Sequence, residues 1–209
     1  MLRLLDRNAA YEMLMEASRL NPGKWVDHSI TVAKTCEKLA MSLNVDSERA
    51  YVIGLMHDIG RRCGVTGTRH SIDGYMFLKN QGFEDIGRYC ITHSYFVKDI
   101  RNIVGKWDYT KEEENFVTDF LNTINYDIYD KLVQISDCMS LPNGVTIIER
   151  RLVDVHLRNG INESVVDTWK NLYKIQAEIE NELGYSIYKL FPEAKENIDT
   201  KLIKEVLTF

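Results

Sequence analysis

The His57-Asp58 pair is the feature of this sequence with the clearest capacity for chemistry. His28 precedes the pair by 29 residues, and Asp137 follows it by 79 residues. Imidazole nitrogens and carboxylate oxygens brought together from separate helices can enclose a hard or borderline divalent metal ion. A metal ion held in this way can activate water for attack on a phosphate ester. The residues therefore predict a class of reaction and leave the substrate open.

The histidines of the chain are clustered. Four of the five lie between residues 25 and 95, namely His28, His57, His70 and His93. A single histidine is more often a hydrogen-bonded core or surface residue, and a single aspartate such as Asp137 more often forms a salt bridge. The joint pattern, at inward-facing helical positions, favours a metal site. His156 lies outside the pattern, and we interpret it as structural or exposed.

The elements that must position these residues are predicted to be helices, because apolar residues recur at helical spacing along most of the chain. A stripe from Ala10 to Leu20 ends at Asn21-Pro22-Gly23, and Asp46 is predicted to cap the helix that delivers His57. Residues 60–69 are expected to form a loop, and residues 94–109 to be irregular. Further helices are predicted at about 26–43, 71–80, 84–92, 110–122 and 127–140, from a cap at Thr146 to Asn159-Gly160, and from 165 to a stop at Gly184. No strand alternation is found, so the predicted fold class is all-α.

Composition narrows the class of protein. The 209 residues are 44% apolar and 27% charged, as expected for one globular domain with a sizeable core. A net charge of −5 argues against general nucleic-acid binding. The four cysteines lack CxxC spacing, which favours thiols in a reducing cytosol. No apolar run approaches a membrane span, and residues 1–6 do not begin a signal peptide, so a cytoplasmic protein without a membrane partner is expected.

The segment between Ile59 and Trp107 is locally basic. It holds eight Lys or Arg, four acidic residues and seven of the twelve glycines. Arginine binds phosphate through two parallel hydrogen bonds, and glycine admits close backbone approach. We therefore expect a small phosphorylated substrate, with Arg61 and Arg62 as its phosphate contacts. The alternative is ordinary surface charge on a loop.

These residues carry a resemblance to a known family. The residues are His28, His57-Asp58-Ile59-Gly60 and Asp137. With them, the chain resembles the HD-domain superfamily of metal-dependent phosphohydrolases over about residues 22–142. The additional His70 and His93 resemble its dinuclear branch, which includes the bacterial HD hydrolases of diadenosine tetraphosphate and the HD-GYP phosphodiesterases. The resemblance implies an all-α helical bundle. Beyond the residues that carry the resemblance, a C-terminal helical extension is expected at about 145–209, which packs on the core or forms an oligomer contact.

The resemblance also implies a ligand set. One metal ion would be held by His28, His57, Asp58 and Asp137, and a second by His70 and His93, with Asp58 bridging. The dinucleotide hydrolases usually carry Lys where Arg61 stands here. They also carry Pro and Arg shortly after the last Asp, whereas residues 137–144 contain Pro142 but no Arg. Gly74-Tyr75 lacks the Pro of the GYP signature.

The expected function is hydrolysis of a phosphate ester or anhydride of a nucleotide or dinucleotide, by attack of a metal-bound hydroxide. Asp58 and Arg61 would be the catalytic residues, and Asp73 is a candidate general acid. The cofactors would be two divalent ions, drawn from Fe, Mn, Mg, Ni, Co and Zn. One alternative is an HD-type diiron oxygenase acting on a carbon substrate, and another is a non-catalytic regulatory module that contains metal.

Overall fold

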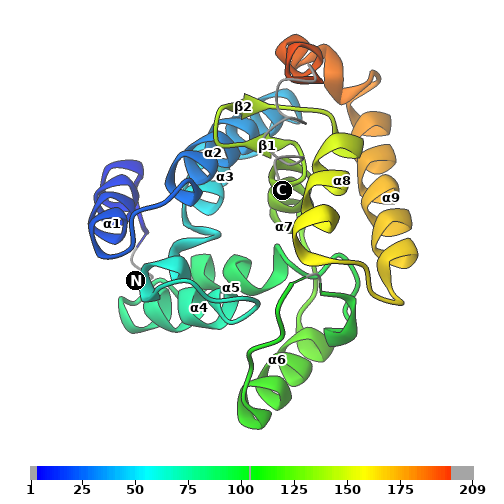
Figure 1. The fold of residues 1–209 in the computed structure, drawn as a ribbon. Helices are drawn as coiled ribbons and strands as arrows, with labels where there is room; N and C mark the ends of the chain where they lie inside the picture. Colours follow the sequence, from blue (N-terminus) through cyan, green and yellow to red (C-terminus); the bar gives the residue numbers. More distant parts are fainter. Residues whose placement is uncertain (1–3, 104, 199–209) are drawn as a thin grey trace.

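The computed structural model describes residues 4–103 and 105–198. The first three residues of the N-terminal segment, and residues 199–209 of the expected C-terminal extension, lie outside this description. The described chain is built from helices, joined by loops and one very short hairpin (Figure 1). The predicted all-α class is confirmed.

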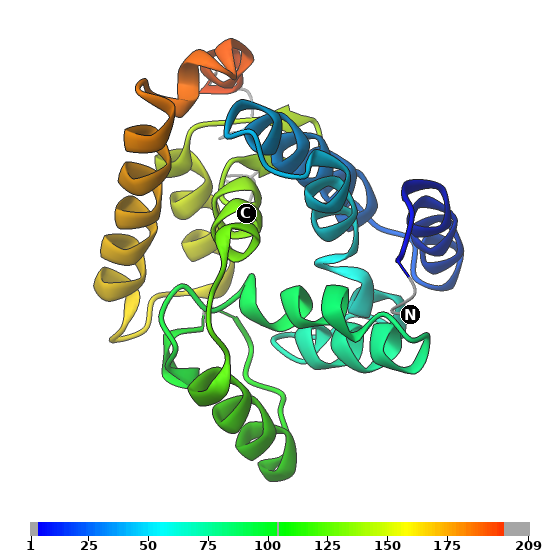
Figure 2. The same cartoon turned by 180° about the vertical axis from the view of Figure 1, so that it is seen from behind.

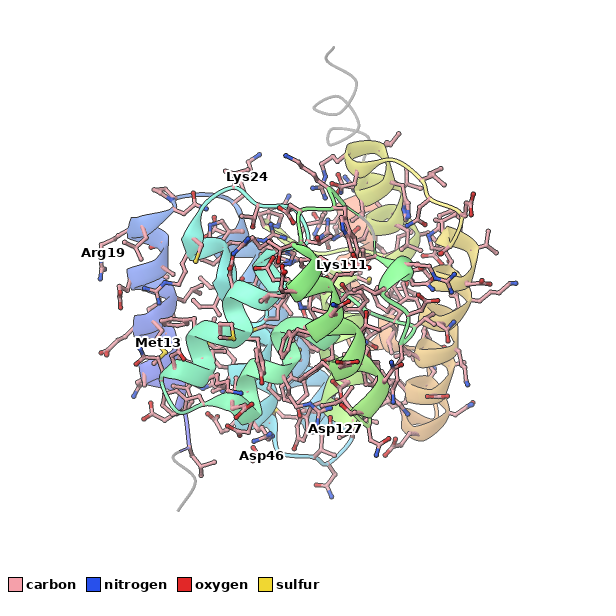
Figure 3. The ribbon with its side chains drawn as sticks, turned by 90° about the horizontal axis from the view of Figure 1, so that it is seen from below. Met13, Arg19, Lys24, Asp46, Lys111 and Asp127 are labelled. Carbon is pink, nitrogen blue, oxygen red and sulfur yellow. The ribbon has the colours of Figure 1, made fainter. Side chains whose placement is uncertain are left out.

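The first three helices form one end of the bundle. They are α1 (Arg7–Leu20), α2 (Trp25–Ser42) and α3 (Ser47–Met56). Asp46 caps α3 as predicted, because its side chain accepts a hydrogen bond from the backbone N–H of Arg49. The α1 stripe is buried at Ala10 but not at its last member, since Leu20, the last residue of the helix, is exposed. Figure 3 shows α1, with Met13 and Arg19, at one edge of the molecule, opposite α9.

Close approach of α2 and α3 brings the first two candidate ligands together. At Gly54 of α3, a Cβ atom would lie only 2.7 Å from the Cα atom of Ala33 in α2. The missing side chain therefore lets the two backbones pack against each other. Because Gly54 lies one turn before His57, this contact fixes the end of α3 against the start of α2.

The next segment carries His70 and His93 on a pair of antiparallel helices. Residues 60–69 were expected to be a loop, but a 3-10 helix, η1 (Ile59–Cys63), occupies their first part. It is followed by α4 (His70–Asn80) and α5 (Glu84–Thr92), which lie side by side (Figure 2). At Gly60 a Cβ atom would lie 1.9 Å from the carbonyl oxygen of His70, so η1 packs directly on the start of α4.

Residues 94–103 and 105–109 are irregular, as predicted, apart from the short 3-10 helix η2 (Ile100–Asn102). The chain continues through α6 (Lys111–Thr123) to α7 (Ile128–Asp137). Thr110 and Asp127 cap these two helices by reciprocal side-chain bonds with the third helical residue. The helix that was expected to run to Ser140 ends instead at Asp137.

Two expectations for the next residues were wrong. Pro142 and Asn143 form the turn of a two-stranded antiparallel hairpin, β1 (Ser140–Leu141) and β2 (Gly144–Val145), where no strand was expected. Thr146 does not cap the following helix, α8 (Ile148–Asn159), because Ile147 occupies the cap position and no side chain there makes the bond.

The C-terminal helices pack beside α7. Gly160 ends α8 and Gly184 ends α9 (Val165–Leu183), both with positive φ, as predicted. Two short 3-10 helices follow, η3 (Ile187–Lys189) and η4 (Pro192–Ile198). Within the described residues, no helix has the length and apolarity needed to cross a bilayer. Cys36, Cys90 and Cys138 are buried free thiols, whereas Cys63 is exposed.

Candidate metal centre

Five helix ends converge on one buried cluster of side chains. His28 lies in the first turn of α2 and His70 begins α4. His57 and His93 directly follow the last residues of α3 and α5, and Asp137 is the last residue of α7. The four histidines are between 1% and 6% exposed. The fold therefore brings five of the six predicted ligands to helix termini, and Asp58 follows His57 in the turn.

The distances separate the cluster into two overlapping groups. In the first, ligand atoms of His28, His57 and Asp137 all lie within 4.8 Å of one another. In the second, the same holds for His57, Asp58 and His93. The rings of His57 and His93 stand edge to face, with centroids 4.9 Å apart. Both groups have the dimensions and donor types that suit a divalent cation.

Backbone carbonyls fix which ring nitrogen carries the lone pair. The Nδ1 atom of His57 lies 2.7 Å from the carbonyl oxygen of Gly54, and that of His70 lies 2.6 Å from the carbonyl oxygen of Gly67. Nδ1 of His93 likewise faces a carbonyl at 3.2 Å. A carbonyl accepts only, so each Nδ1 carries the proton and each Nε2 carries a lone pair. Metal-binding histidines are oriented by bonds of this kind.

The lone pairs at the centre of the cluster are unsatisfied. Among the described residues, the buried atoms Nε2 of His57, Nε2 of His70 and Oδ1 of Asp58 have no hydrogen-bond partner. Nε2 of His70 nevertheless lies 3.1 Å from Oδ1 of Asp58. Two acceptors at this distance repel each other unless a cation or a proton lies within reach of both. The residues therefore fit a metal ion.

Asp58 lies between the two groups. Its Oδ1 atom faces His70 at 3.1 Å and His93 at 3.8 Å. Its Oδ2 atom faces Nε2 of His57 at 3.8 Å and accepts a hydrogen bond of 2.6 Å from Nε of Arg61. The two oxygens of one carboxylate are thus directed to different histidines, as a bridging ligand requires.

The protonation states also suit metal ligands. Burial lowers the pKa of His93 to about 3, and burial lowers the pKa of His28 although Asp137 opposes the shift. Burial alone would raise the pKa of Asp58, but the neighbouring guanidinium of Arg61 helps to hold it well below its usual value. At neutral pH these groups are unprotonated imidazoles and an ionised carboxylate, which are the forms that bind metal.

Asp137 has a second charged neighbour besides His28. Nε2 of His28 lies 2.9 Å from its Oδ1 atom, and Nη2 of Arg151 lies 3.5 Å from the same oxygen. Burial alone would raise the pKa of Asp137, but these neighbours outweigh burial and hold the pKa below its usual value. Arg151 belongs to α8 and was missed by the sequence argument, which looked for an arginine only in residues 137–144. The sequence feature that could have indicated Arg151 is the Arg150-Arg151 pair on the next predicted helix.

The structure separates the two arginines predicted to contact substrate. Arg61 points to the cluster and pairs with Asp58. Arg62 pairs at 3.1 Å with Glu16 of α1, and its guanidinium lies 3.8 Å from the ring centre of Phe77 in α4. Asp73, the candidate general acid, lies one turn beyond His70 and pairs with Arg69 at 3.4 Å, and burial raises its pKa.

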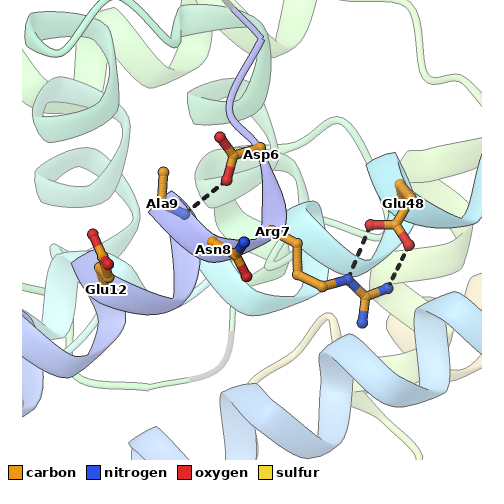
Figure 4. Close-up of a pocket in the computed structure, with 6 residues that line it drawn as sticks. All are labelled: Asp6, Arg7, Asn8, Ala9, Glu12 and Glu48. Carbon is orange, nitrogen blue, oxygen red and sulfur yellow. Dashed lines mark hydrogen bonds and ion pairs between the residues drawn. The ribbon is translucent and has the colours of Figure 1, made fainter.

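Two other features lie apart from the cluster. His156 is buried on α8, where its Nδ1 atom donates to the carbonyl of Leu152 and its ring meets Trp169 edge to face. An open pocket of about 570 Å³ lies between the start of α1 and α3 (Figure 4). Asp6 caps α1 there, and Arg7 binds Glu48, so its polar groups serve the helix terminus and an ion pair.

The described helices bring four histidines and two aspartates together in an all-α fold, in an arrangement that could hold a metal ion. The sequence matches the model of the HD domain over residues 25–141, which is more than half of the chain. The chain therefore belongs to the HD-domain family, whose members commonly bind divalent metals and act as metal-dependent phosphohydrolases. No curated protein and no solved structure matches the chain.

Proposed function

We propose that this protein is a dinuclear metal-dependent phosphohydrolase that cleaves a phosphate ester or anhydride bond of a nucleotide or dinucleotide. One observation carries the proposal. The unpaired Nε2 atom of His57 belongs to both overlapping groups of ligand atoms, and the unpaired Nε2 atom of His70 lies 3.1 Å from the unpaired Oδ1 atom of Asp58. A buried arrangement of lone pairs without donors is unfavourable unless cations satisfy it.

Each of the six side chains has a place in this proposal. One ion would be held by His28, His57, Asp58 and Asp137, and the second by Asp58, His70 and His93. When bound, such ions lower the pKa of water and polarise a phosphoryl group. The carbonyls of Gly54 and Gly67 keep the imidazoles oriented, so the ligands need little rearrangement on binding.

Arg61 is the proposed substrate contact. Its side chain is 32% exposed while its Nε atom lies 2.6 Å from Asp58, so it reaches the cluster from the solvent side. A guanidinium in this position binds phosphate oxygens and offsets the negative charge that grows on them during reaction. Arg62 is occupied by Glu16 and Phe77, and we assign it no role.

Charge supports the proposed substrate class. In the sequence, the basic segment that contains Arg61 also contains His70 and His93, whereas the whole chain carries a net charge of −5. Local positive charge beside a metal centre favours a small anion over a nucleic-acid strand, which needs an extended basic surface.

A phosphate-release screen tests the proposal. Protein purified without chelator would be supplied with Mn²⁺, Co²⁺, Ni²⁺, Mg²⁺, Fe²⁺ or Zn²⁺ and assayed on nucleotides, dinucleoside polyphosphates and model esters. We expect release with at least one substrate, loss in EDTA, and loss in the Asp58→Asn variant. Asp167→Asn, at an exposed residue of α9, is the matched control and should keep wild-type rates. Oxygen uptake with a polyol or phosphonate, without phosphate release, would instead establish the oxygenase alternative.

A further inference from the structure

Arg151 is a buried cation whose hydrogen-bonding capacity is poorly used. Its side chain is 15% exposed, and its Nε–H group has no partner among the described residues. Its Nη1 atom donates to Asp154 at 3.1 Å, and its Nη2 atom stands 3.5 Å from Oδ1 of Asp137, beyond ordinary hydrogen-bond length. Leaving buried donors unmade is costly, and five N–H groups on a rigid fork suit an anion.

The side chain is held in place from the solvent side. Asp154 accepts from Arg151 and also from Arg158, whose Nη2 atom lies 2.7 Å away. Asp154 is therefore shared by two arginines. Arg151 is directed inward to Asp137, whereas Arg158 lies on the surface and is 53% exposed. This arrangement fixes the guanidinium of Arg151 before any ligand arrives, which reduces the entropy lost on binding.

The cluster then contains two matched pairs of opposite charge. Arg61 contacts Asp58 at 2.6 Å, and Arg151 faces Asp137 at 3.5 Å. Cations bound to the cluster would engage the lone pairs of both carboxylates. The guanidinium of Arg61 would then share Asp58 with metal, and that of Arg151 would share Asp137 with metal and keep Asp154, in a site that has gained positive charge.

We propose that Arg151 is a second anion-binding arginine of this site, which contacts a phosphate group of the substrate once the metal is bound. It comes from α8, outside the segment that matches the HD domain. The inference rests on the proposed function, because it assumes a phosphorylated ligand at the metal cluster. It differs from a role in orienting Asp137, which would change metal affinity instead.

Titration of the Mn²⁺-saturated protein with inorganic phosphate separates these roles. We expect Arg151→Gln to weaken phosphate binding by about tenfold to a hundredfold, the range for a lost charge-assisted hydrogen bond, with unchanged Mn²⁺ affinity. Arg151→Lys should recover part of the loss, because it restores charge without the fork. Lys170→Gln, at an exposed cation of α9, is the control and should bind phosphate like the wild type.

Several results would overturn the inference. One is unchanged phosphate affinity in the Arg151 variants. Another is a fall in the Mn²⁺ affinity of these variants that is as large as the fall in their phosphate affinity. A third is no phosphate binding by the Mn²⁺-saturated wild type. If Arg151→Gln does not fold, as judged from its thermal midpoint, Arg151→Lys decides by the same criteria. Absence of turnover in the wild type would contradict the proposed function alone, because the role of Arg151 is determined from binding.

Discussion

Replacing Gly60 by alanine should remove one half of the metal centre. A Cβ atom at this position would lie 1.9 Å from the carbonyl oxygen of His70 and 2.4 Å from the backbone nitrogen of Gly74, whereas ordinary contact begins at 3.4 Å. The start of α4 must therefore move by about 1.5 Å, since backbone atoms in a packed interior cannot give way as a flexible side chain does. Metal–ligand distances are expected within about 0.2 Å of their standard values, so a shift of this size places His70 outside binding distance.

The expected result is a selective loss. Gly60→Ala should reduce bound metal from two ions per chain towards one, because His70 moves while His28, His57 and Asp137 stay in place. Overpacking of this kind should also lower the free energy of unfolding by about 1–3 kcal/mol. Elemental analysis and urea denaturation measure the two effects.

The control is Gly82→Asn, at a glycine with φ of 83° and no atom within 4 Å of an added Cβ. Asparagine tolerates this backbone conformation, so the variant should keep both ions and nearly wild-type stability. A Gly60→Ala variant with two ions and unchanged stability would refute the packing argument.

Two further predictions concern charged residues. Arg61→Ala should reduce kcat/KM for a phosphorylated substrate by about tenfold to a hundredfold with metal content unchanged. Arg61→Lys should recover part of this loss. Steady-state kinetics of Arg61→Ala that match the wild type would exclude Arg61 from the site. Asp130→Ala should lower the free energy of unfolding by about 3–5 kcal/mol, measured in urea, because it leaves Arg88, 2.6 Å away, without its buried carboxylate. Arg101→Ala, at an exposed ion pair, is its control and should have little effect, so equal losses in both variants would contradict the argument.

Most of the fold could be predicted from local sequence. Helix starts at Asp46 and Thr110 and helix stops at Gly160 and Gly184 depend on capping within one turn, which a sequence displays directly. The β1–β2 hairpin could not be predicted, because two-residue strands are too short for an alternating pattern. Thr146 was a misleading cap candidate, because α8 begins one residue later after the hairpin and Ile147 occupies its N-cap position.

The candidate site was only partly accessible from sequence. Residue type and helical position predict which histidines face inward, and the structure brings those side chains together. Residue type alone does not show where long side chains at the surface of a turn point, so only the resemblance favoured Arg61 over Arg62, and the packing then separates them. Arg151 approaches Asp137 only through the placement of α8, which depends on tertiary contacts.

Metal content per chain tests the central claim most directly. Protein purified without chelator and saturated with divalent metal would be freed of unbound ions and measured by inductively coupled plasma mass spectrometry. The dinuclear arrangement around Asp58 predicts close to two ions per wild-type chain. At most one ion per chain at saturation would contradict it, because His70 and His93 would then have no metal to bind.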